Sequence, residues 1–331
     1  MQYDQNVLTR TERRIFALRT LYSRAGYRSY RMRKFEDYDL YSRNKDFLLS
    51  DRVITFTDTN GRLKALKPDV TLSLVRNLKD RPDELQRLYY DENVYRVSER
   101  TNTFKEIMQM GLECIGAADN DAVAEVLDLA EKSLALVAED QDYLLKVSDL
   151  DIMTLLIDDM TDSKDMKAEL LKLAGEKNLH GIRDLCGRND VPAEKCATLT
   201  ALLGIYGAPE QTLPELEELC RGTVAEAESA EMISVMRELT DDSRRIVIDF
   251  SVTGDTSYYN GVAFAGYIEG IPEPVLVGGR YDMLMRRMKK RSRAIGFAVY
   301  LDSLGMLGRN AGDRAIDEFF SNTVRDEGGE D

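Results

Sequence analysis

Histidine is almost absent from this chain, because His180 is the one imidazole among 331 residues. Catalysis by a Ser/His or Cys/His pair needs an imidazole beside the nucleophile, and many protein metal sites use imidazole ligands. We therefore expect no such catalytic pair and no metal site. His180 lies in a polar helical stretch, and we expect it at the surface.

Paired cysteines are also missing, since the four cysteines at 114, 186, 196 and 220 form no Cys-x-x-Cys motif. In a chain of this length, that pattern argues against a disulfide framework or a zinc site. We expect reduced thiols, and the composition points to no cofactor.

Positive charge and long apolar runs are scarce. The 45 Lys and Arg residues face 59 Asp and Glu residues, a formal net charge of −14, which repels polyphosphate unless a local basic patch overrides it. The first residues carry no apolar signal region, and no run of about 18 apolar residues occurs anywhere. We expect a cytoplasmic protein that binds neither nucleic acid nor membrane.

Hydrophobic spacing predicts the first elements. Residues 8–25 have the apolar period of an amphipathic helix, and Gly26 is a suitable terminator. Residues 53–57 and 63–67 flank Asn60-Gly61, which favours the positive φ angles of a tight hairpin. We further predict helices over 71–78 and 121–137, the latter capped by Asn120 or Asp121, and strands over 93–99, 106–116 and 143–149.

The composition and the predicted secondary structure of the chain then change twice. Residues 162–245 contain helices rich in Lys, Glu and Leu, with no convincing strand, and we interpret them as a helical insertion. Strand patterns return at 244–252, 258–270 and 273–279, and a helix-rich stretch is predicted from Ala294. This is an α+β design: a core over 1–161 and 246–310, the insertion between them, and a flexible acidic tail over 311–331.

Four short segments carry a family resemblance. They are Lys67-Pro68-Asp69-Val70-Thr71, Gln109-Met110-Gly111-Leu112-Glu113, Tyr258-Tyr259-Asn260-Gly261 and Gly278-Gly279-Arg280-Tyr281-Asp282. In this order, and over residues 8–307, they resemble the histidyl-tRNA synthetase catalytic domain. The resemblance implies a class II aminoacyl-tRNA synthetase-like antiparallel sheet of six or seven strands flanked by helices. It also implies the helical insertion and a homodimer formed through the N-terminal helix and the strand around Phe35-Glu36.

The same resemblance implies a histidine-binding pocket. Free histidine offers an ammonium, a carboxylate and an imidazole, so a selective site needs an anion for the first and hydrogen-bonding partners for the last. By similarity, Asp69, Thr71 and Gln109 hold the ammonium, and Glu113, Tyr259 and Tyr281 face the imidazole. The spacing of Gln109 and Glu113 places both on one face of a strand. Tyr258, Arg96 and Arg280 complete the implied histidine-binding set.

Most of the cations that serve ATP in that family are replaced. Activating an amino acid with ATP needs preorganised positive charge at the phosphates. Gly254 stands where the family carries an arginine before its paired tyrosines, and Asp302-Ser303 replaces the Glu-Arg pair of its third motif. Arg96 matches the arginine of the second motif. The chain also ends soon after Leu304, so we expect no anticodon-binding domain.

A histidine pocket without catalytic cations resembles the regulatory subunit of ATP phosphoribosyltransferase, a synthetase paralogue. That family implies no catalytic residues in this chain, a short-form catalytic subunit as partner in a hetero-oligomer, and feedback control of the first step of histidine biosynthesis by histidine. Two alternatives stay open: a truncated synthetase-like enzyme that adenylates histidine, and a stand-alone amino-acid sensor or scaffold. The basic run over 286–293 is either a solvated loop, a patch for a phosphate-bearing ligand or a face for an acidic partner.

Overall fold

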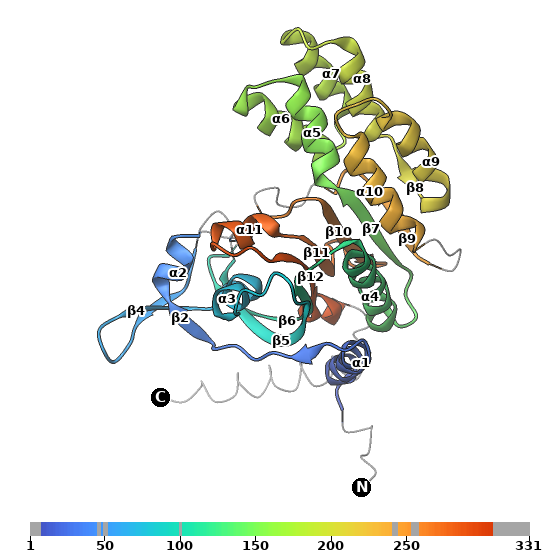
Figure 1. Cartoon of the computed structure of the whole chain (residues 1–331). Coiled ribbons are helices and arrows are strands. Elements are labelled where there is room, and N and C mark those ends of the chain that lie inside the picture. The colour runs from blue at the N-terminus through green and yellow to red at the C-terminus, as the bar shows by residue number, and fades with distance from the viewer. Residues whose placement is uncertain are drawn as a thin grey trace, which may run out of the picture.

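The computed structural model describes residues 8–44, 48, 52–98, 101–239, 244–252 and 258–306. Figure 1 shows a large sheet with helices packed against it, a small sheet at one edge and a group of helices standing above. The predicted tail and Gly254 lie outside the described residues. None of the described helices has the length and apolar character needed to span a membrane.

The large sheet has nine strands in the order β1-β5-β6-β12-β11-β10-β7-β9-β8. Its six central strands, from β5 to β7 in that order, are antiparallel, which confirms the predicted sheet; β1 and β9 add parallel to its two sides. The strands are β1 (Arg28–Ser29), β5 (Gln86–Val97), β6 (Phe104–Gly116), β7 (Tyr143–Asp149), β8 (Tyr206–Gly207), β9 (Ile246–Asp249), β10 (Val262–Ile268), β11 (Leu276–Arg280) and β12 (Arg293–Tyr300).

The helix predicted from Ala294 is wrong, because Arg293–Tyr300 is strand β12 in the middle of the sheet, paired with β6 and β11. A strand buried on both faces shows a continuous apolar run without alternation, and periodicity cannot tell such a run from a buried helix. A single 3-10 helix, η3 (Leu301–Met306), follows it.

Helices α1 (Arg10–Arg24) and α4 (Asn120–Ala138) pack together on one face of the sheet. α1 matches its prediction: Thr9 and Glu12 form a capping box, and Gly26 follows its end with φ +86°. The cap of α4 is Asp119 rather than Asn120 or Asp121, because the chain leaves the extended conformation one residue earlier than expected.

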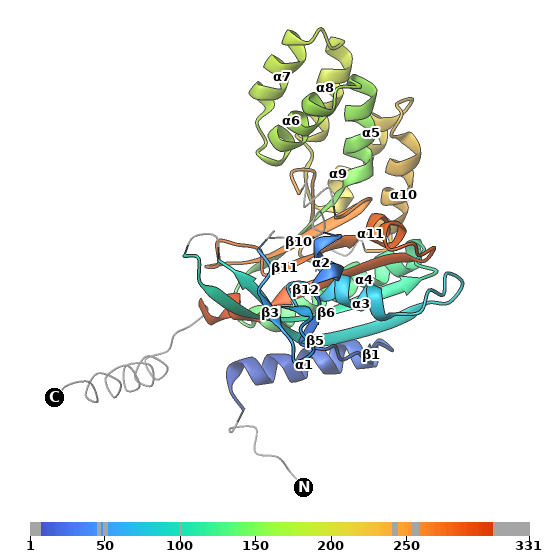
Figure 2. The same cartoon turned by 90° about the vertical axis from the view of Figure 1, so that its left-hand side faces the viewer.

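A three-stranded sheet lies at one edge in the order β2-β4-β3, formed by β2 (Phe35–Asp37), β3 (Thr55–Thr57) and β4 (Leu63–Leu66). The predicted hairpin is present, but its turn is not a two-residue Asn-Gly turn. The Asp58 carboxylate accepts bonds from the backbone N–H groups of Asn60 (2.8 Å) and Arg62 (3.0 Å), and Gly61 alone takes a positive φ in this loop. Two short helices, α2 (Tyr38–Ser42) and α3 (Val70–Asn77), lie near this sheet (Figure 2).

Six helices form the upper group in Figure 1. They are α5 (Leu150–Met160), α6 (Lys164–Gly175), α7 (Leu179–Arg188), α8 (Ala193–Leu202), α9 (Pro209–Cys220) and α10 (Glu226–Arg237). The group contains the two-residue strand β8, which the sequence did not reveal, because its pairing with β9 is long-range and too short to leave a pattern. His180 is exposed on α7, as predicted, and the four cysteines are buried free thiols.

Lys177, from the turn between α6 and α7, ties the helices to the sheet. Its ammonium lies 2.8 Å from the buried carboxylate of Asp249 on β9, which also pairs with Lys146 of β7 at 2.9 Å. These hydrogen bonds outweigh burial and hold the pKa of Asp249 at about 2. The ion pair between Lys177 and Asp249 therefore joins the helical group to β9.

Candidate functional site

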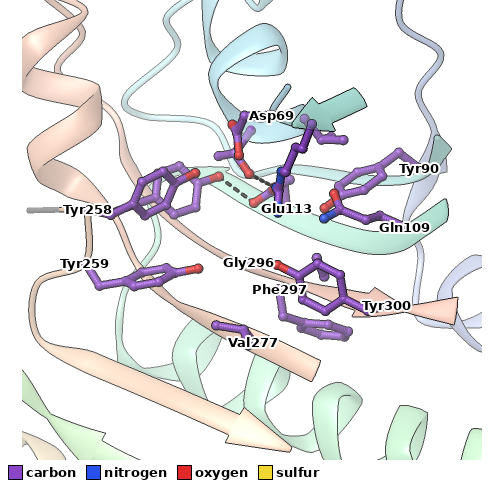
Figure 3. A pocket seen from close by; sticks show the side chains of 15 residues that line it. Asp69, Tyr90, Gln109, Glu113, Tyr258, Tyr259, Val277, Gly296, Phe297 and Tyr300 are labelled. Atoms are coloured by element: carbon purple, nitrogen blue, oxygen red, sulfur yellow. Dashed lines mark hydrogen bonds between the residues drawn. The ribbon is translucent and has the colours of Figure 1, made fainter. Parts of the chain in front are cut away.

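A cavity of about 150 Å³ opens on the face of the sheet opposite α4. This volume is on the order of ten times what one water molecule needs, so the cavity suits a ligand the size of an amino acid. Its lining includes eight of the nine residues predicted from the sequence: Asp69, Thr71, Arg96, Gln109, Glu113, Tyr258, Tyr259 and Tyr281. Figure 3 shows these side chains converging from α3, the central strands and the segment before β10.

Glu113 on β6 is the most buried acid of the cavity, with 1% of its surface exposed. Its Oε2 accepts a bond from the Tyr281 hydroxyl at 2.6 Å, and its Oε1 accepts one from the Thr71 hydroxyl at 2.8 Å (Figure 3). Burial nevertheless dominates and raises the pKa of Glu113 to about 8. A carboxyl group with this pKa is mostly protonated at pH 7, so Glu113 can share a proton with a basic ligand.

The floor beneath these side chains is made by glycines on two neighbouring strands, β11 and β12. Gly296 on β12 lies opposite Glu113 on one side and Gly279 on the other. A Cβ on Gly296 would lie 1.9 Å from Glu113 Oε2, and one on Gly279 would lie 2.7 Å from the Tyr259 ring. Gly279 is thus explained by space for the cavity, whereas Gly278 is explained by core packing on the other face, where a Cβ would lie 2.5 Å from both Phe264 and Phe297.

Asp69 has a structural role as well as a place in the lining. It caps α3, its carboxylate accepting from the Leu72 N–H at 2.7 Å, and burial raises its pKa against the opposing effects of this bond and of nearby Arg96 and Lys67. Arg96 is held by a bond of 3.0 Å from its Nε to the Pro68 carbonyl. Lys67 is fully buried in an ion pair with Glu92 at 2.9 Å.

Aromatic rings form the walls. Tyr258 packs on Tyr259 at 4.8 Å between centroids and on Tyr281 at 6.1 Å. On the other side lies Tyr90 beside Gln109 (Figure 3), and the sequence analysis missed Tyr90. The strand pairing explains why Tyr90 lines the cavity. Tyr90 on β5 pairs with Gly111 on β6, which has no side chain, so the phenol ring of Tyr90 lies across β6. Phe297 and Tyr300 of β12 were missed because their segment was assigned to a helix.

Arg280 is the one predicted site residue that the structure does not place in this cavity. It precedes Tyr281, and it faces the other way, its side chain lying beside Gly261 and near Asp151 at the start of α5. Its Nε and Nη2 are buried and have no hydrogen-bond partner in the described part of the chain. Its charge also acts on Glu228 of α10. Arg280 therefore belongs to the junction between the sheet and the helical group.

The cavity has two carboxyl groups and little positive charge. Among the described residues that line it, Arg96 is the one cation. Asp302, at the position of the family's third-motif pair, accepts a bond from the Met108 backbone N–H at 2.8 Å and thereby joins η3 to β6. The arrangement can bind a small molecule with a cationic group and a hydrogen-bonding ring, whereas a triphosphate would meet one arginine and two acids.

Comparisons with known proteins identify a matching family and similar proteins. The sequence model of the histidyl-tRNA synthetase family matches residues 5–304. The ATP phosphoribosyltransferase regulatory subunit of Clostridium acetobutylicum is 28% identical over 300 residues, which cover 87% of this chain and 72% of that protein.

Two solved structures share the fold. One is described as an ATP phosphoribosyltransferase regulatory subunit/histidyl-tRNA synthetase from Bacillus halodurans; it aligns with a TM-score of 0.78 at 22% identity and covers 99% of this chain and 89% of its own. The other is an ATP phosphoribosyl transferase (HisG:HisZ) complex from Thermotoga maritima, with a TM-score of 0.66 at 17% identity, covering 91% of this chain and 98% of that one. At these identities, the likeness shows the fold.

Proposed function

The chain belongs to the histidyl-tRNA synthetase family, and we propose that it is a histidine-binding regulatory subunit of an ATP phosphoribosyltransferase. It is similar along most of its length to proteins named as that regulatory subunit. The observation that carries the proposal is the shortage of cations in the cavity, where Arg96 is the one cation among the described lining residues and lies beside two buried or partly buried carboxyl groups. Such a site favours a cationic amino acid over a nucleotide.

The ligand is assigned by the positions of these groups. Glu113, fixed by Tyr281 and Thr71, takes the imidazole, because a carboxyl group can give or accept the ring proton. Asp69 and Gln109 take the ammonium, and Tyr258 and Tyr259 enclose the ring. The hydroxyl of Thr71, assigned to the ammonium from sequence, lies on Glu113 in the described structure, and we reassign it to the imidazole end.

Regulation follows from the partner that we propose. Histidine binding shifts the balance between active and inhibited assemblies with a short-form catalytic subunit, by no more than its differential affinity for the two. Phe35 (52% exposed), Phe56 and Leu63 expose apolar surface on the small sheet, which supports a homodimer through the region around Phe35-Glu36 within that hetero-oligomer. This role places the protein in the cytoplasm, in the first step of histidine biosynthesis.

Calorimetry with histidine tests the pocket. We expect the wild-type chain to bind, and Glu113→Ala to bind more weakly by about 1–3 kcal/mol, roughly five- to 150-fold, because a buried ligand group loses its partner. The exposed Glu169 on α6 provides the control, since Glu169→Ala should bind as the wild type does. Absence of binding by a folded wild-type chain would refute the assignment.

The two alternatives are separated by different assays. Histidine-dependent exchange of pyrophosphate into ATP by the isolated chain would establish the adenylating enzyme and overturn the regulatory proposal. A stand-alone sensor would bind histidine but would not co-purify with a short-form catalytic subunit. We expect no exchange and stable co-purification.

A further inference from the structure

A second cavity, which we call the basic cavity, lies beside the small sheet and α2 and has a volume of about 900 Å³. Five cationic side chains line it, from four segments: the end of α2, the β3–β4 loop, the last turn of α3, and the end of helix α11 (Asp282–Arg287) with the turn that follows it. They are Arg43, Arg62, Arg76, Arg287 and Lys289. The basic run over 286–293 thus supplies two of them.

Ion pairing within the described residues accounts for little of this charge. Arg43 pairs with Asp39 at 3.0 Å, and the other lining acid, Asp37, pairs with Lys64 at 2.6 Å. Arg62, Arg76 and Lys289 make no ion pair with any described residue. Five cations and two acids line this concave surface, so it carries a local excess of positive charge in a chain of net charge −14.

Helix dipoles explain some of these cations but not all. Arg43, Arg76 and Arg287 lie at helix C-termini, where a positive charge is favourable. Arg62 lies in a loop, and Lys289 follows α11 with φ +58°, a left-handed conformation that glycine adopts more easily. Lys289 takes this conformation as part of the C-terminal cap of α11, where its N–H donates to the Arg286 carbonyl at 2.9 Å, and it lines the cavity.

We propose that the basic cavity binds a small anion carrying two or more phosphate groups. The planar guanidinium group matches the geometry of phosphate oxygens and binds them through paired hydrogen bonds, and four of the five cations are arginines. The volume lies in the range of small-molecule sites, whereas a protein partner needs a broader and flatter surface. This site is separate from the histidine cavity, and it borders the apolar surface proposed for the homodimer, with which it shares Leu63.

Titration calorimetry of the full chain with phosphate, pyrophosphate and tripolyphosphate tests this site. We expect tripolyphosphate to bind at least about tenfold more tightly than phosphate, because each added group meets another cation. The double variant Arg62→Gln/Lys289→Gln should lose at least about tenfold in affinity for tripolyphosphate. Neither side chain makes a described ion pair or hydrogen bond, so thermal unfolding and histidine binding should stay unchanged.

The exposed Lys172 on α6 and Arg183 on α7 supply a matched control, since Arg183→Gln/Lys172→Gln removes the same two charges far from the cavity. An equal loss in Arg183→Gln/Lys172→Gln would reduce the effect to net charge and overturn the proposal. Equal affinity for phosphate and tripolyphosphate would overturn it too. So would tighter binding of an oligoglutamate peptide than of tripolyphosphate, because the surface would then be a face for an acidic protein segment.

Discussion

The histidine cavity and the basic cavity differ in how they treat charge. The first is small and enclosed, and its acids are buried, so burial raises the pKa of Glu113 to about 8 and each hydrogen bond to it matters. The second is six times larger in volume, from about 150 to about 900 Å³, and its cations are solvated. Desolvation makes binding at the first site depend on the protonation states of Glu113 and the ligand. The second site attracts anions through the summed charge of its five cations.

The two sites also differ in what builds them. The histidine cavity stands on the central strands, where glycines leave room and neighbouring strands fix every side chain. The basic cavity gathers loop and helix-end residues around the edge of a small sheet. Substitutions at the first site should therefore act through packing and hydrogen bonds, and those at the second through charge.

The largest difference should come from Gly296→Ala. The added methyl group would lie 1.9 Å from Glu113 Oε2 and 2.5 Å from the Leu112 carbonyl, so the pocket must distort. We expect histidine binding to fall below detection, a loss of about 1–3 kcal/mol in unfolding free energy, and unchanged tripolyphosphate binding. Gly187→Ala on α7 is the control, because its methyl group meets nothing within 4 Å and should leave binding intact. Undiminished histidine affinity in a folded Gly296→Ala would show that the ligand lies elsewhere.

Tyr281→Phe should have the next largest effect. It removes the 2.6 Å bond to Glu113 and leaves the ring in place, so the pKa of Glu113 should rise further. A hydrogen bond to a charged group contributes about 1.5–3 kcal/mol, so histidine affinity measured by calorimetry should fall by roughly ten- to 150-fold. Tyr206→Phe, at an exposed ring, should change nothing. Tripolyphosphate affinity should be the same in all three proteins.

The pH dependence of histidine affinity should show the smallest effect of the three. Glu113 and the ligand imidazole together need one proton in the complex. Between the free imidazole pKa of about 6.5 and pH 8 the empty pocket already holds that proton, so affinity should be flat. Above pH 8 the pocket has lost it, and below about 6.5 both partners carry one, so affinity should fall by up to about tenfold per pH unit on either side.

The basic cavity gives the contrast for this measurement. Its lining cations are four arginines and one lysine, residue types whose ordinary pKa values lie above this pH range. Tripolyphosphate affinity, once corrected for the titration of the probe itself, should therefore show no maximum. A histidine affinity that instead falls steadily as the pH rises above about 6.5 would mean that Glu113 is already ionised before the ligand binds, because the one proton of the complex must then come from the imidazole.

The alternation of side chains along a strand predicted part of the site. It correctly placed Gln109 and Glu113 on one face of β6. The same rule predicts that Arg280 and Tyr281, at the end of β11, point to opposite faces. The family resemblance placed both in the pocket and ignored this rule. Tyr90 and Phe297 needed the pairing of β5 with β6 and of β6 with β12, which no local pattern contains.

The sequence by itself determined the local elements and the chemistry at hand: the capped first helix, the hairpin, the glycine-rich segments and the shortage of cations for a triphosphate. Only the tertiary structure decided that Ala294 lies in a central strand, that Arg280 turns toward the helices, and that five cations from four segments share one cavity. The reason is physical. Periodicity and capping depend on neighbours along the chain, whereas burial, pKa and cavity shape depend on strands and helices brought together from far apart in the sequence.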